Sequence, residues 1–85
     1  MKLDITENPN CLEVLKQFVG EPVAVRKRQP INFFMAAIEM EITNVHGTFK
    51  VFPGDYVLVT KHDAWPVSSQ YFKQYYDVVW ERHEN

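Results

Sequence analysis

The chain has 85 residues, a net charge of −2 and a hydrophobic fraction of 46%. This length suits one small domain, so we expect a single domain over residues 1–85. The negative charge argues against a general nucleic-acid binder, which is usually basic overall, although a local basic patch can still contact RNA. The apolar content is high for a short chain, which indicates either an exposed partner or homodimer surface or a merely well-filled core.

The cysteine count and the N-terminal residues indicate the compartment. Cys11 is the only cysteine in the sequence, so no intrachain disulfide can form and a reducing compartment is expected. The first ten residues, MKLDITENPN, lack the apolar core of a signal peptide. No apolar run has the length of a membrane span. We therefore expect a cytoplasmic protein that contacts no membrane.

The N-terminal segment predicts a short strand and then a helix. Residues 1–7 alternate apolar and polar side chains, and Asn8 or Asn10 can cap a helix that follows. Apolar residues at helical spacing predict this helix over residues 10–19. Gly20 is expected to end it in the left-handed conformation.

A short strand and a basic tripeptide come next. Residues 23–26 alternate in polarity, which predicts a strand. If this strand continues, Arg26 and Arg28 share one face and Lys27 points away. Three adjacent cations repel one another, so they are usually kept for solubility or for an anionic partner, such as RNA or the acidic residues of a protein. Both interpretations stay open.

Residues 31–45 predict a strand whose two halves differ. The second half alternates, with Glu39 and Glu41 on the polar face, which is typical of a half-buried strand. The first half contains Phe33 and Phe34 and is apolar on both faces. Either both faces are covered there, or one face meets a partner. An exposed Phe33 or Phe34 would be a natural interface anchor.

Turn signals divide the rest of the sheet region. A hairpin turn at residues 44–47, with Gly47 at positive φ, is expected to lead into a strand. Pro53-Gly54-Asp55 then bends the chain into residues 56–61. This apolar run does not alternate, so we expect a strand buried on both faces, with strands on one side and a helix on the other. A turn at His62-Asp63 and a short strand at 64–67 follow.

A second helix is expected after Ser68 or Ser69, either of which can cap it. Its shared face carries Tyr71, Phe72, Tyr75 and Tyr76. We expect this face to be mostly core, with Tyr75 the member most exposed. Residues 78–80 predict a final short strand or an extended tail. Together the elements predict an α+β fold, in which a small twisted antiparallel sheet carries two short helices packed on one face.

The segment from Gly47 to Tyr76 resembles small proteins encoded in bacteriophage and prophage genomes. The shared landmarks are Pro53-Gly54-Asp55-Tyr56, Trp65-Pro66 in place of a Tyr-Pro pair, Phe72 and Tyr76. A departure is His62-Asp63-Ala64, where the family usually has a glycine-bearing turn. The landmarks are turn and core residues, so the resemblance implies fold more than function, and it transfers no catalytic residue.

Small acidic phage proteins of this size often act against host defence, and one group antagonises the ribonuclease toxin of a toxin–antitoxin system. The resemblance therefore implies a non-catalytic protein that binds and inhibits a host protein in the host cytoplasm. The alternative is an RNA-binding module, alone or bridging RNA and a protein. The candidate partner- or RNA-binding residues are Arg26, Lys27, Arg28, Phe33, Phe34 and Tyr75.

The residues that could act in catalysis or bind a metal show only weak spacing patterns in the sequence. Cys11 falls on the apolar side of the first helix and is expected to be a core cysteine. Glu39 and Glu41 are about 7 Å apart on a strand, which resembles a paired-carboxylate site, but an ordinary outer sheet face explains them better. Two histidines and two aspartates, His46, His62, Asp55 and Asp63, would need to converge at one end of the sheet to bind metal. We expect no catalytic residue, no metal site and no cofactor.

Overall fold

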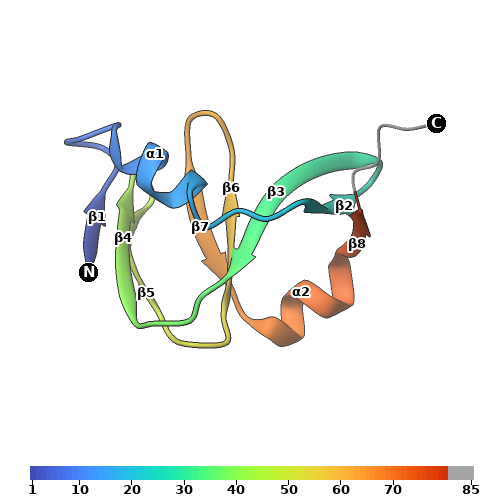
Figure 1. Ribbon diagram of the computed structural model, residues 1–85. Coiled ribbons are helices and arrows are strands. Elements are labelled where there is room, and N and C mark those ends of the chain that lie inside the picture. Colours follow the sequence, from blue (N-terminus) through green and yellow to red (C-terminus); the bar gives the residue numbers. More distant parts are fainter. Residues whose placement is uncertain (81–85) are drawn as a thin grey trace.

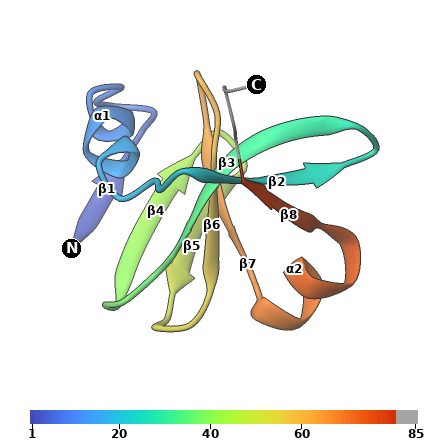
Figure 2. The same ribbon diagram turned by 45° about the vertical axis from the view of Figure 1, so that its right-hand side comes forward.

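The computed structural model describes residues 1–80, which form eight strands in two sheets and two short helices (Figures 1 and 2). In chain order, the elements are β1 (Lys2–Asp4), α1 (Cys11–Lys16), β2 (Pro22–Arg26), β3 (Gln29–Met35), β4 (Met40–Asn44), β5 (Gly47–Val51), β6 (Tyr56–Val59), β7 (Ala64–Val67), α2 (Ser69–Tyr75) and β8 (Asp77–Trp80). Within this part of the chain, no helix is both long and apolar enough to cross a membrane.

The strands are divided between two sheets, which corrects the expectation of one. Sheet A has the order β1-β4-β5, and sheet B has the order β7-β6-β3-β2-β8. All described pairings are antiparallel except β1 with β4, which is parallel. Residues 36–39 carry the chain from β3 in sheet B to β4 in sheet A. The predicted strand over residues 31–45 is therefore two strands with a crossover between them.

Two hydrophobic cores lie on opposite faces of sheet B. The inter-sheet core consists of Leu3, Ile5, Leu12, Leu15, Phe34, Ala36, Met40, Ile42, Val51, Val57, Val59 and Ala64. The helix-side core consists of Ala24, Phe33, Leu58 and Phe72, with Ile31, Tyr56, Trp65, Val67 and Tyr76 packed against it. The leucines of α1 belong to the first core and Phe72 of α2 to the second. The two helices therefore do not cover one face, and Figure 2 shows them at opposite ends of the molecule.

Strand β6 is buried on both faces, as its apolar run predicts, and β3 is buried on both faces at Phe33 and Phe34. Phe34 faces the inter-sheet core and Phe33 the helix-side core. In β6, Val57 faces the inter-sheet core and Leu58 faces the helix-side core. Of the two alternatives for Phe33 and Phe34, coverage of both faces is thus the one observed.

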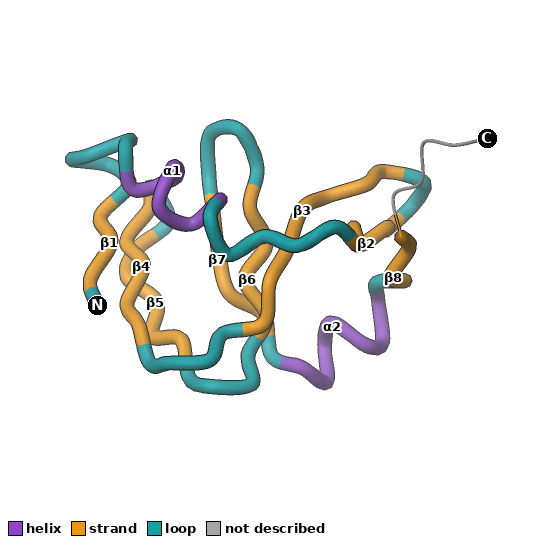
Figure 3. The backbone as a smooth tube through the Cα atoms, viewed as in Figure 1, coloured by secondary structure: helices purple, strands orange, loops and turns teal. Residues whose placement is uncertain are grey.

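The Pro53-Gly54 turn is fastened to the crossover between the sheets. Gly54 has a φ of +98°, and the backbone N–H of Asp55 donates to the carbonyl of Phe52 at 2.9 Å. The N–H of Gly54 donates to the carbonyl of Ala36 at 2.9 Å, and the N–H of Ala36 donates to the carbonyl of Asp55 at 2.8 Å. Figure 3 shows the two loops together at the lower end of the molecule. These bonds satisfy backbone groups that the strands leave unpaired.

Helix α1 is shorter than predicted and ends differently. Asn10 occupies its N-cap, without a side-chain hydrogen bond to the helix. At the other end, the N–H groups of Phe18 and Val19 donate to carbonyls three residues back, at 3.1 and 3.2 Å. This tightened last turn ends the helix. Gly20 does not have positive φ, so the expected left-handed stop is wrong.

Candidate functional site

The basic tripeptide forms the end of β2 and a tight turn, not a continuous strand. Arg26 pairs with Gln29, so Lys27 and Arg28 are the two turn residues of the β2–β3 hairpin. Their φ angles are 53° and 65°, the left-handed values of a type I′ hairpin turn, where Asn-Gly is preferred. The expectation that Arg26 and Arg28 share a strand face is therefore wrong, because regular pairing ends at Arg26.

This turn holds two long cationic side chains in an unfavourable backbone conformation. A left-handed residue that is not glycine costs roughly 1–2 kcal/mol. Lys27 and Arg28 are both exposed, and within residues 1–80 neither forms an ion pair. Backbone strain without an internal contact to offset it is typical of positions retained for function.

Replacing Lys27 by Asn together with Arg28 by Gly is expected to raise the free energy of unfolding by about 1 kcal/mol, because Asn-Gly adopts this turn without the steric penalty. Urea unfolding followed by circular dichroism measures the change. The matched control is Val45→Asn with His46→Gly in the β4–β5 hairpin, where neither residue has positive φ. A gain in the control but not at Lys27-Arg28 would contradict strain in the basic turn.

Arg26, in contrast, is held by three tyrosines. Tyr71 and Tyr75 belong to α2, and Tyr76 is the residue that follows α2. Its Nη1 donates to the hydroxyl of Tyr71 at 3.2 Å, and its Cζ lies 5.3 Å from the ring centroid of Tyr75 and 5.8 Å from that of Tyr76. The hydroxyls of Tyr76 and then Tyr71 raise the pKa of the Arg26 guanidinium above its ordinary value. Cation–π contacts and this hydrogen bond fasten α2 to the β2–β3 hairpin.

The exposure of the four aromatic residues Tyr71, Phe72, Tyr75 and Tyr76 agrees in part with the prediction from the sequence. Tyr75 is 44% exposed, as predicted, but Tyr71 is also 40% exposed. The buried member is Phe72, which stacks on Tyr56 at 4.0 Å between ring centroids and on Tyr76 at 5.3 Å. Tyr76 is thus held at the end of a stack of three rings, next to Arg26.

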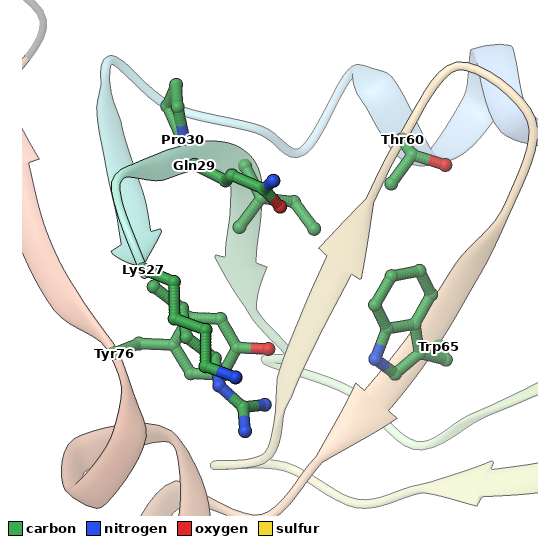
Figure 4. A pocket seen from close by; sticks show the side chains of 8 residues that line it. Lys27, Gln29, Pro30, Thr60, Trp65 and Tyr76 are labelled. Atoms are coloured by element: carbon green, nitrogen blue, oxygen red, sulfur yellow. The ribbon is translucent and has the colours of Figure 1, made fainter.

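A groove of about 620 Å³ opens between the β2–β3 hairpin and the β6–β7 hairpin. Its lining residues are Arg26, Lys27, Gln29, Pro30, Ile31, Thr60, Trp65 and Tyr76. Figure 4 shows Lys27 and Tyr76 on one side of this hairpin groove and Trp65 on the other, on β7. The lining contains two cations and two large aromatic rings but no carboxylate.

A smaller cavity of about 320 Å³ shares Pro30, Ile31 and Thr60 with the groove. Its other lining residues include Val23, Asn32 and Val59, which belong to the opposite face of sheet B, so it is not a continuation of the groove. The hairpin groove itself combines two cations with aromatic and apolar groups. Such a surface suits an extended anionic ligand that also carries flat rings.

Phe33 and Phe34 are not exposed anchors, which corrects the sequence-based hypothesis. Their side chains are 9% and 6% exposed. The ring centroid of Phe33 lies 5.0 Å from that of Phe72, and the centroid of Phe34 lies 5.2 Å from that of Phe18. Both rings are held in the two cores because β3 is central in sheet B.

The reactive groups weighed in the sequence form no catalytic cluster among the described residues. Glu39 lies just before β4 and pairs with Lys50 at 3.6 Å, and Lys50 is also the residue opposite Glu41, so a cation lies beside both glutamates. Cys11 is half-buried against the inter-sheet core. In the described part of the chain, no three or more His, Cys, Asp or Glu side chains are grouped to hold a metal ion.

The hairpin groove thus joins predicted and unpredicted residues. Arg26 and Lys27 line it and Arg28 lies beside them in the turn, but Gln29, Trp65 and Tyr76 were not among the candidates. Gln29 and Ile31 are two residues apart and therefore share a face of β3. This spacing is the local signal in the sequence for that wall of the groove. No protein-family model, no curated protein and no solved structure matches this chain.

Proposed function

We propose that this protein is a non-catalytic RNA-binding module that holds a single strand in the hairpin groove. The observation that carries the proposal is the assembly of Arg26, Lys27, Trp65 and Tyr76 around one open groove without a carboxylate. Proteins that bind single strands combine a cationic track for the phosphates with aromatic side chains that stack on bases. The groove supplies both components.

Each part of the groove has a role in this proposal. Lys27, which lines the groove, and Arg28, the next residue of the turn, contact phosphates as exposed cations. Trp65 offers a partly exposed ring for base stacking. Tyr76, whose ring contacts Phe72 and Arg26, forms the facing wall of the groove. Arg26 is a positioning residue that keeps Tyr76 and the hairpin together.

The negative net charge of the chain does not conflict with this role, because the carboxylates lie elsewhere. Glu13 is on α1, Glu39 lies just before β4 and Glu41 lies on it. The hairpin groove is not lined by an acidic residue. A ligand in the groove therefore contacts two cations and no carboxylate in its lining, which favours an anionic ligand despite the total charge.

Charge reversal at the turn tests the proposal. The double change Lys27→Glu and Arg28→Glu is expected to weaken binding of a fluorescein-labelled 12-nucleotide RNA by more than about tenfold at low salt. Fluorescence anisotropy over a salt series measures it. The slope of log affinity against log salt should become shallower by about 0.7 for each phosphate that the variant no longer neutralises.

The matched control is Lys16→Glu with Lys50→Glu, which gives the same change in net charge. Both lysines lie on elements away from the hairpin, α1 and β5 (Figure 1), in exposed ion pairs that contribute little to stability. This control should bind RNA almost as the unmodified protein does. Absence of RNA binding by the unmodified protein, or equal weakening in both variants, would refute the proposal.

A second candidate function is favoured by an apolar patch at the loops that join the sheets. Met35 at the end of β3, Ile38 and Phe52 are 58%, 49% and 52% exposed, and the segments that carry them are joined by the Ala36 hydrogen bonds. Exposed apolar groups of this kind suit a protein partner or a second copy of the chain. With the resemblance to phage proteins, this supports a phage-encoded protein that binds and inhibits a host protein, such as a ribonuclease toxin, in the host cytoplasm.

The two candidates are separable by mutation. Met35→Asp with Phe52→Asp should abolish inhibition of a ribonuclease toxin if this patch binds it, and should leave RNA binding in the hairpin groove intact. Sedimentation of the same variant tests a homodimer through the patch. Retained inhibition and an unchanged oligomeric state in this variant would exclude the patch as the interface.

A further inference from the structure

Trp65 lines a second cavity besides the hairpin groove. This cavity has a volume of about 400 Å³. It is lined by Asn44, His46, Phe49, Asp63, Trp65 and Pro66. We name it the Trp65 cavity. Trp65 belongs to both linings, so the groove and the Trp65 cavity lie next to each other.

The apolar lining of the Trp65 cavity consists of two aromatic rings and a proline. Phe49 comes from β5 of sheet A, and Trp65 and Pro66 come from β7 of sheet B. All three are partly exposed, so they present surface that neither core uses. Flat rings with exposed faces stack favourably on a planar ligand such as a nucleobase.

The polar groups of the Trp65 cavity differ in how much hydrogen-bonding capacity they retain. Asn44 is buried and committed, since its Nδ2 donates to the Ala64 carbonyl at 2.9 Å and its Oδ1 accepts from the His46 N–H at 2.8 Å. Asp63 is half-buried, and its Oδ1 accepts from the Ala64 N–H at 2.7 Å. A carboxylate has about four acceptor sites, so Asp63 keeps most of its capacity among the described residues.

The backbone holds Asp63 in place. The carbonyl of Asp63 accepts from the Thr60 N–H at 2.8 Å and from the Thr60 Oγ1 at 3.1 Å, and the Asp63 N–H donates back to that Oγ1 at 2.9 Å. Asp63 is therefore held by a rigid turn, and it lines the wall of the Trp65 cavity. A preorganised acceptor discriminates between ligands better than a mobile one.

We propose that the Trp65 cavity is a base-recognition subsite that takes an unstacked guanine from the RNA in the hairpin groove. This inference rests on the proposed function. The Watson–Crick edge of guanine presents two adjacent N–H donors, N1–H and N2–H, which match the two oxygens of a carboxylate. Adenine, cytosine and uracil each place an acceptor beside their donor, which would face the Asp63 oxygens unfavourably.

The geometry also explains why one base is read and its neighbours are not. Trp65 separates the Trp65 cavity from the groove, so one base enters the cavity while the adjacent base stacks in the groove. The groove rings accept any base, because every base has a flat face. Specificity is thus assigned to Asp63, and general affinity to the cations and rings of the groove.

The test uses four labelled 9-nucleotide RNAs, an all-uridine strand and three strands with one central G, A or C. The unmodified protein should bind the G strand about tenfold more tightly than the others, the discrimination typical of a bidentate contact. Asp63→Asn should remove this preference and leave the affinity for the all-uridine strand unchanged, since the new amide places a donor against the donors of guanine.

The matched control is Asp55→Asn, a half-buried turn carboxylate that accepts from the Phe52 N–H and lines neither cavity. It should retain the guanine preference. A second variant, Phe49→Leu, keeps an apolar wall without its ring and should reduce the preference several-fold. Thermal unfolding of each variant confirms that it is folded.

The possible failures are distinguishable. If the unmodified protein binds none of the four strands, the proposed function fails and this inference fails with it. If it binds all four with equal affinity, or if folded Asp63→Asn retains the guanine preference, the base-recognition subsite alone is refuted and RNA binding in the groove stands.

Discussion

Replacing Phe72 by alanine is expected to lower the free energy of unfolding by about 3–5 kcal/mol. Phe72 is 2% exposed and is the one residue of α2 that is buried. Its ring stacks between Tyr56 and Tyr76 and lies 5.0 Å from Phe33. The change therefore leaves a cavity under α2 and removes three aromatic contacts at once. Urea unfolding measures it through the transition midpoint and its slope.

The control for Phe72 is Lys73→Ala, the next residue of the same helix, which is exposed. This variant should change stability by less than about 0.5 kcal/mol. Because Phe72 also supports Tyr76, RNA binding should weaken in Phe72→Ala under conditions where the protein is still folded. A destabilisation by Phe72→Ala no larger than that of Lys73→Ala would mean that α2 does not pack on sheet B as described.

Replacing Asn44 by aspartate is expected to cost about 2–4 kcal/mol at neutral pH, since a buried carboxylate loses a donor and gains a charge. Asn44 is 4% exposed, and its Nδ2 bond to Ala64 links sheet A to sheet B. The aspartate variant would place an oxygen against the Ala64 carbonyl. Chemical unfolding over a range of pH measures the cost.

The pH dependence of the Asn44→Asp variant has a definite sign. Burial against a carbonyl raises the pKa of the new carboxyl in the folded state above its unfolded value of about 3.9. Between these two pKa values the folded state binds more protons, so the variant loses stability as pH rises. The defect should be largest above the folded-state pKa and smallest below the unfolded one. Asn10→Asp, at the exposed N-cap of α1, is the control and should cost little at any pH. A constant defect in Asn44→Asp would contradict the buried bond to Ala64.

Short-range chemistry accounts for the features that could be predicted from the residues alone. Ser68 caps α2 by accepting from the Tyr71 N–H at 3.1 Å, and Gly47 has positive φ, both as the sequence predicts. The two-sided burial of β6 was predicted as well, because its apolar run has no polar face to present to water. These features depend on a residue and its near neighbours in the chain, so no knowledge of distant pairing was needed.

The sequence alone did not predict the features that depend on pairing between strands distant in the chain. The sequence has no Asn-Gly pair at residues 27–28, so the turn there was invisible. It follows from the β2–β3 register, in which Ala24 lies opposite Ile31 with both side chains toward the helix-side core. The break at residues 36–39 was also missed, because the apolar pattern continues across it. What ends β3 there is the anchoring of Ala36 to the Pro53-Gly54 turn.

The residues by themselves determined that this protein is a small sheet-rich domain with two short helices, since alternation, turn residues and caps act over a few positions. They also singled out Arg26, Lys27 and Arg28 as the strongest local charge. Only the tertiary structure decided that the basic turn meets Trp65 and Tyr76, because the strand order β7-β6-β3-β2-β8 brings together segments far apart in the chain. A groove is a product of strand pairing, and pairing between distant strands is set by how the whole chain buries its apolar faces.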